Sequence, residues 1–196
     1  MAAPPAVSAV LMSTTPAKLV LAYRIDAADC LTHVNEAWSE FARQNHGEEL
    51  MPQHVLGHNL LRAIADTTVR ELYTRMILAA RAGRTLRFRY RCDAPARRRT
   101  FEMEIRLVEA GAVEFVSTLQ HEEPRPSVYV LESDRRRDER MLLICSWCQK
   151  VELPDATWVP VEAAVEILHL FDADTYPQLT HGMCGLCKAG WHDSDL

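Results

Sequence analysis

The chain has 196 residues, of which 48% are hydrophobic and 25% are charged, and its formal net charge is −5 at pH 7. This composition is ordinary for one or two small globular domains and excludes a chain that is disordered throughout. The acidic balance argues against nucleic acid as a main partner, and no apolar run is long enough to cross a bilayer.

Residues 1–16 are rich in Ala, Pro, Ser and Thr, and we expect a disordered tail there. The segment has no basic start, and prolines interrupt its apolar stretch, so it does not resemble a signal peptide. We therefore expect a cytoplasmic protein without membrane association. In that compartment, paired cysteines are more typical of metal or redox sites than of structural disulfides.

The segment that follows begins with two expected strands. Residues 18–25 are rich in β-branched and aromatic side chains, and a turn separates them from a second short strand over residues 30–34. Asn35 is a favourable N-cap for the helical pattern that begins at Glu36.

The middle of this region is expected to be helical. Residues 45–57 are polar and contain Pro and Gly, which predicts a loop with a short helix. The clearest helix covers residues 67–82, because apolar side chains recur on one face and Gly83 can end it.

Three strands are expected next, over residues 85–92, 100–108 and 113–121, with a loop at 93–99. Apolar and charged side chains alternate along the first two, which is typical of half-buried antiparallel strands. Their arginines and glutamates can pair across the solvent face. The order predicts an α+β unit with helices on one face of a five-stranded antiparallel sheet.

Residues 122–138 contain prolines and a charge run, and we expect a linker there. A small zinc-ribbon-like cysteine module is expected over residues 139–192, with a helix at 159–171 that begins near Pro160. Because the linker has few residues able to bury a shared interface, we expect a chain ending near His121 to fold by itself.

The most informative pattern is a pair of C-x-x-C motifs, formed by Cys145 and Cys148 and by Cys184 and Cys187. Two such turns facing each other make a tetrahedral site of four thiolates, and zinc suits this geometry best. We therefore predict a structural zinc ion. Four thiolates leave no open coordination position, so we expect His181 to cap or orient the turn by hydrogen bonding instead of binding the metal.

Two other interpretations of the cysteines stay open. They can be reduced structural thiols, although Pro, Gly and polar residues surround them. They can also form a redox switch, in which oxidation of the zinc thiolates releases the metal. A reactive thiolate needs a basic neighbourhood, and only Lys150 and Lys188 are close in sequence. His192 lies near the chain end and is expected to be solvated.

The first part of the chain resembles the PAS domain, a sensory fold of bacterial signalling proteins. Three segments carry the resemblance: Thr32–Trp38 at the entry to the first helix, Gly57–Leu60 after it, and Phe88–Asp93 in a strand. The resemblance assigns residues 17–121 to a PAS-like domain. It implies a sensor or signal-transduction protein without naming what is sensed.

The cysteine module resembles a short tail that follows PAS or receiver domains. The matching residues are Ile144–Lys150, Trp158, Glu162 and Thr180–Cys187. No kinase, cyclase or receiver segment is recognisable, so we expect output through a protein partner or a homodimer. The apolar segment Ala9–Met12 is the surface we expect to support self-association.

Cofactors of PAS relatives are not expected here. Cys30 and Cys92 lie at strand ends outside any flavin-adduct motif, and we expect them to be small buried or edge residues. A haem would need His54, His58 or Met76 as an axial ligand, and each is better explained as a surface or core residue.

Aromatic and methionine side chains have the spacing of a hydrophobic core, which would hold a small-molecule ligand only if the middle helices leave a void. The arginine runs 97–99 and 135–137 are expected to be solvated loops. No catalytic motif is present, which predicts a non-enzymatic sensor or interaction protein.

Overall fold

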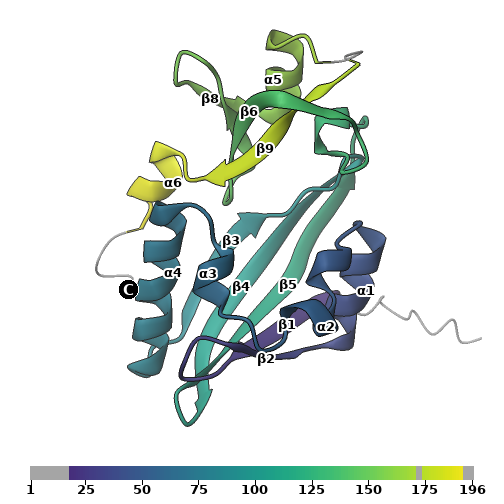
Figure 1. The fold of residues 1–196 in the computed structure, drawn as a ribbon. Helices are drawn as coiled ribbons and strands as arrows, with labels where there is room; N and C mark the ends of the chain where they lie inside the picture. The colour runs from purple at the N-terminus through teal and green to yellow at the C-terminus, as the bar shows by residue number, and fades with distance from the viewer. Residues whose placement is uncertain (1–17, 171–173, 192–196) are drawn as a thin grey trace, which may run out of the picture.

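The computed structural model describes residues 18–170 and 174–191 (Figure 1). The expected tail at 1–16, with its apolar segment Ala9–Met12, lies outside the described residues, as does His192. In the part that is described, no helix is both long and apolar enough to cross a membrane.

The first unit, residues 18–124, contains a five-stranded antiparallel sheet in the order β2-β1-β5-β4-β3. Its strands are β1 (Val20–Ile25), β2 (Leu31–Val34), β3 (Leu86–Arg91), β4 (Arg97–Glu109) and β5 (Ala112–Pro124). Its helices are α1 (Glu36–Gln44), the short 3-10 turn η1 (Glu48–Leu50), α2 (Pro52–Val55), α3 (Leu60–Ala63) and α4 (Thr67–Arg81). The helices cover one face of the sheet in Figure 1, which confirms the predicted α+β architecture.

The two faces of the sheet divide as the sequence predicts. Arg87 on β3 lies opposite Glu104 on β4, with 2.6 Å between their charged groups, and the next pair is Arg89 with Glu102 at 3.8 Å. These exposed pairs each contribute less than about 1 kcal/mol. Phe101 on the other face is completely buried. Burial of that apolar face, and not the ion pairs, drives formation of the sheet.

The arginine run Arg97–Arg99 corrects one expectation. These residues belong to β4, where they pair with the last residues of β5, and they do not form a solvated loop. The acidic residues opposite explain the difference, because Arg97 lies 2.6 Å and Arg99 lies 3.5 Å from the carboxylate of Glu122. Of the second run, Arg137 also differs from a solvated loop, since its guanidinium donates to three backbone carbonyls.

The second unit, residues 137–170 and 174–191, covers nearly the span expected for the cysteine module. It has a four-stranded sheet in the order β8-β7-β6-β9, in which β6 and β9 run parallel. Its elements are β6 (Arg137–Cys145), β7 (Lys150–Glu152), β8 (Trp158–Pro160), α5 (Val161–Ile167), β9 (Tyr176–Gly182) and α6 (Gly185–Ala189). The expected helix over 159–171 is shorter, because the chain turns at His169, whose φ is 52°.

The segment expected to be a linker takes part in packing. It contains the 3-10 turn η2 (Tyr129–Leu131), and Val128 and Val130 are buried in a core with β6, β7 and α5. In another core, Trp147 and Cys184 of the second unit pack among residues of α4 and the large sheet. The reason given for independent folding, a lack of residues that bury a shared interface, is therefore wrong.

Asn35 caps α1 and also holds β1. Its side-chain oxygen accepts from the backbone N–H groups of Trp38 at 2.9 Å and Ala22 at 3.1 Å, and its amide donates to the Val20 carbonyl at 2.8 Å. We expect Asn35→Ala to lower the free energy of unfolding by about 2 kcal/mol, the upper end of cap substitutions. Urea unfolding measures this. Gln44→Ala, which removes an exposed contact on the same helix, is the control, and equal stability of the two variants would contradict the prediction.

Candidate metal centre

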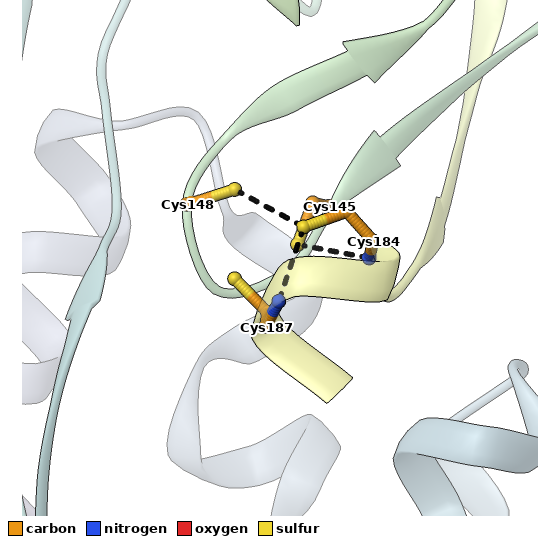
Figure 2. Close-up of side chains that lie close together, drawn as sticks. All are labelled: Cys145, Cys148, Cys184 and Cys187. Atoms are coloured by element: carbon orange, nitrogen blue, oxygen red, sulfur yellow. Dashed lines mark hydrogen bonds between the residues drawn. The ribbon is translucent and has the colours of Figure 1, made fainter. Parts of the chain in front are cut away.

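The four cysteines lie on two turns that the parallel pairing of β6 and β9 brings together. Cys145 is the last residue of β6 and lies directly opposite Gly182, the last residue of β9. The turns that follow the two strands therefore begin at the same edge of the sheet. The N–H of Ser146 donates to the Gly182 carbonyl at 2.9 Å and ties the turns to each other. Figure 2 shows the cysteine side chains of the two turns converging.

Each turn has its own local cause. After Cys148 the chain adopts a positive φ of 58° at Gln149, whose N–H donates to the Cys145 carbonyl at 2.9 Å and closes the first turn. In the second turn, Cys184 is the N-cap of α6, and its sulfur accepts from the N–H of Cys187 at 3.4 Å. The x-x spacing therefore turns each pair of sulfurs toward the same point.

The sulfur positions fit a tetrahedral metal ion. The four Sγ atoms all lie within 4.8 Å of one another, and those of Cys148 and Cys184 are 3.7 Å apart. Metal–sulfur bonds of about 2.3 Å in a tetrahedron require sulfurs about 3.8 Å apart. Cys145 and Cys184 are buried, while Cys148 and Cys187 are half-buried. The site can thus hold a metal ion, and the residues are those that the sequence predicted.

The acidities of the thiols show what a cation would change. Burial raises the pKa of Cys145, but the backbone N–H groups directed at its sulfur outweigh this and lower it overall. Burial and the neighbouring Cys145 raise the pKa of Cys148 to about 11, and burial also raises that of Cys187. Without a metal, burial and the neighbouring sulfurs therefore oppose ionisation of Cys148 and Cys187. A divalent cation would offset this repulsion and bind all four as thiolates.

The first turn also carries a tryptophan whose role the sequence did not predict. Trp147 stacks on Phe88 of β3 with ring centroids 5.4 Å apart, and Trp191 meets it edge to face at 5.9 Å. The backbone carbonyl of Trp147 accepts a hydrogen bond from the N–H of Arg91 at 2.8 Å. The candidate metal centre is therefore fixed directly to the edge of the large sheet. The sequence feature that could have indicated this contact is the aromatic residue between the two candidate ligands Cys145 and Cys148.

A glycine allows β9 to approach α4 at this point. A Cβ on Gly182 would lie 3.0 Å from the Cδ1 atom of Leu143 and 3.6 Å from a carboxylate oxygen of Asp66, the N-cap of α4. The tighter of these contacts is to Leu143 of the neighbouring strand β6, so a larger residue would require that side chain to shift.

Other predicted site residues lie apart from the cysteines. His181 is exposed and is not one of the residues grouped around the candidate metal position. His54 and His58 are exposed, whereas Met76 is fully buried in the core.

The two remaining cysteines, Cys30 and Cys92, are free and half-buried at strand ends, as the sequence predicted. Burial raises the pKa of Cys92, which makes it an unreactive thiol.

A buried ion network also joins the units, near the start of β4. The Asp93 side chain is 0% exposed and lies 3.1 Å from Arg125, which is 3% exposed. Arg125 also lies 2.9 Å from Glu162 at the start of α5, and the same Glu162 oxygen accepts from Arg98 of β4 at 2.7 Å. The sequence does not reveal this network, because its members come from distant segments.

A scan against protein-family models finds no match to this chain, and a search of curated proteins finds no significant relative.

Proposed function

We propose that the protein is a non-enzymatic, bacterial-type signalling protein of the cytoplasm. In this proposal the first unit is a PAS-like domain that senses a small ligand or binds a protein partner, and a structural zinc ion shapes the second unit. The resemblance in the sequence and the order of two strands, a helical middle and three strands support the PAS-like assignment.

The observation that carries the proposal is the docking of the cysteine turn on the large sheet. Trp147, which lies between two candidate ligands, contacts Phe88 of β3 and Tyr73 of α4. In this proposal, a conformational change in the sheet or its helices shifts the second unit through these packed side chains. This gives the protein a physical route for a signal, either to a partner or within a homodimer.

Zinc is the metal that the donor set favours. Soft thiolates in a tetrahedral arrangement select zinc over magnesium or calcium, which take oxygen ligands. Four thiolates also fill the coordination sphere, so the metal would supply structure and no site for a reacting water.

The alternative is a redox-responsive regulator in which the thiolates are the switch. The half-buried positions of Cys148 and Cys187 favour it, because an oxidant can reach them. Zinc loss under mild peroxide that a thiol reductant reverses would support this alternative over a purely structural ion.

We expect protein purified without added metal to contain about one zinc per chain, measured by elemental analysis. Cys145→Ser should lower this content, because three thiolates bind zinc more weakly than four. Cys30→Ser, which removes a thiol at a strand end of the first unit, is the matched control and should retain the zinc. A low metal content that is the same in all three proteins would overturn the zinc assignment.

A further inference from the structure

A cavity of about 440 Å³ lies at the junction of the two units, and its volume is within the range of small-molecule sites. The α3–α4 segment and β3 of the first unit form one side, and β9 with the turn after β6 forms the other. Its aromatic lining residues are Tyr23, Tyr73, Phe88, Tyr90 and Trp147. Flat apolar ligands stack favourably on such walls.

The charge of the lining restricts the ligand further. Among the described residues that line the cavity, Asp66 is the single carboxylate, and there is no Lys or Arg. Desolvation holds the pKa of His181 below its ordinary value, which disfavours the imidazolium form in this lining. An anion would therefore meet a carboxylate without a compensating cation, whereas an amine or organic cation would meet aromatic faces and one negative group.

Polar groups without partners remain in the wall. Within residues 18–170 and 174–191, the hydroxyls of Tyr23 and Tyr73 have no hydrogen-bond partner. Trp147 is 8% exposed, and its buried indole N–H also lacks a partner in the described part of the chain. Of these groups the Trp147 indole N–H is buried without a partner, and a ligand acceptor placed beside it would remove that unfavourable desolvation.

We propose that this cavity binds a small, flat, uncharged or cationic organic molecule, and that its affinity is coupled to metal occupancy of the cysteine site. The inference rests on the proposed function, because it takes the cysteine cluster to be a zinc site. It adds the ligand class and the means by which the two sites communicate.

The coupling follows from the chain between two cysteines. Ser146 and Trp147 line the cavity and stand between Cys145 and Cys148. A metal ion that fixes both sulfurs also fixes the intervening backbone, and with it the Trp147 wall. Loss of the metal leaves this turn free to change conformation, so the ligand must then order it. By linkage, a bound ligand must retain the metal to the same degree.

The test uses two fluorescent probes with the same ring system. N-phenylnaphthylamine is neutral, and anilinonaphthalene sulfonate carries an added negative charge. We expect the neutral probe to bind zinc-loaded protein at least about tenfold more tightly than the sulfonate, a difference of about 1.4 kcal/mol. Removing zinc with a chelator should weaken the neutral probe by about 5- to 150-fold, the usual range of coupling between sites.

Two substitution pairs locate the binding. Thr180→Trp narrows the cavity and should abolish probe binding, while Gln178→Trp, on an exposed position of the same strand, should leave it unchanged. Asp66→Asn retains an N-cap side chain but removes the charge, so it should narrow the difference between the probes.

The reciprocal measurement needs no metal-free protein: the neutral probe should slow zinc transfer to a chelator. Equal probe affinity with and without zinc, together with an unchanged rate of zinc transfer, would overturn the coupling. Probe binding that Thr180→Trp does not affect would overturn the cavity assignment. Protein that holds no zinc would instead overturn the proposed function, which separates the two failures.

Discussion

Trp147→Ala is expected to lower the free energy of unfolding by about 3–5 kcal/mol, the usual cost of removing a large buried aromatic side chain. Trp147 is 8% exposed and contacts three rings, those of Tyr73, Phe88 and Trp191. Two of these belong to the first unit, so the substitution opens a void between the units and not within one of them. It should therefore weaken the docking of the second unit as well as the global fold.

Urea unfolding followed by far-ultraviolet circular dichroism measures the loss, and zinc content is determined on the same samples. Ser146→Ala is the matched control, because it alters the neighbouring residue of the same turn but removes only a small half-buried hydroxyl. Its effect should be within about 0.5 kcal/mol. Trp147→Ala with full zinc content and a loss below about 1 kcal/mol would show that the turn does not pack on the sheet in solution.

The same packing changes what we expect of a shortened chain. A chain ending near His121 lacks Trp147, and Phe88 and Tyr73 then lose their aromatic neighbours in the second unit. It also cuts β5 before its last residues and leaves Arg97 without its partner Glu122. Such a chain exposes a contiguous apolar patch, which favours aggregation over independent folding.

Local signals were enough to predict most elements of the first unit. Asn35 could be recognised as a cap because the cap interaction is made within four residues, and α4 because its apolar stripe is continuous. The start of β4 could not be predicted in this way. Arg97–Arg99 have the composition of a loop, and they are strand residues only because Glu122 and Glu123 lie opposite them on β5.

For the candidate site, too, the local features could be predicted and the long-range contacts could not. Spacing alone identifies Cys145, Cys148, Cys184 and Cys187, because each pair is local and the geometry of a thiolate turn is general. The position of that site on the large sheet depends on contacts between β3 and the turn after β6, which are far apart in the sequence. No periodicity or motif encodes such contacts, so the cavity and the docking surface became visible only in the structure.

Arg125→Met is expected to lower the free energy of unfolding by about 3 kcal/mol, the lower end of the cost of breaking a buried ion pair. The substitution keeps most of the apolar stem but leaves Asp93, which is 0% exposed, with one fewer cation. It also removes donors from the carbonyls of Ala94 and Pro95, at 2.8 and 3.1 Å. The cost is not larger because Arg91 still pairs with Asp93.

The control is Arg97→Met. The ion pair of Arg97 with Glu122 is exposed to solvent, and losing such a pair costs less than about 1 kcal/mol. A double-mutant cycle of Arg125→Met with Glu162→Gln isolates the bond between the units from the bonds within the first unit. A coupling free energy near zero would mean that the bond between Arg125 and Glu162 does not hold α5 in place, and would leave only Arg98 as the partner of Glu162.

The pH dependence gives an independent check on the same bond. Burial raises the pKa of Glu162, but the helix N-terminus, Arg98 and Arg125 outweigh it and hold the pKa below its ordinary value. An acid with a lowered folded pKa stabilises the fold above its unfolded pKa of about 4.3 and loses that contribution as the pH falls through the folded pKa. The stability difference between the unsubstituted protein and Glu162→Gln should therefore shrink between about pH 6 and pH 3. A difference that stays constant over this interval would show that Glu162 is not ionically bound to Arg125, and the ion network would then not join the two units.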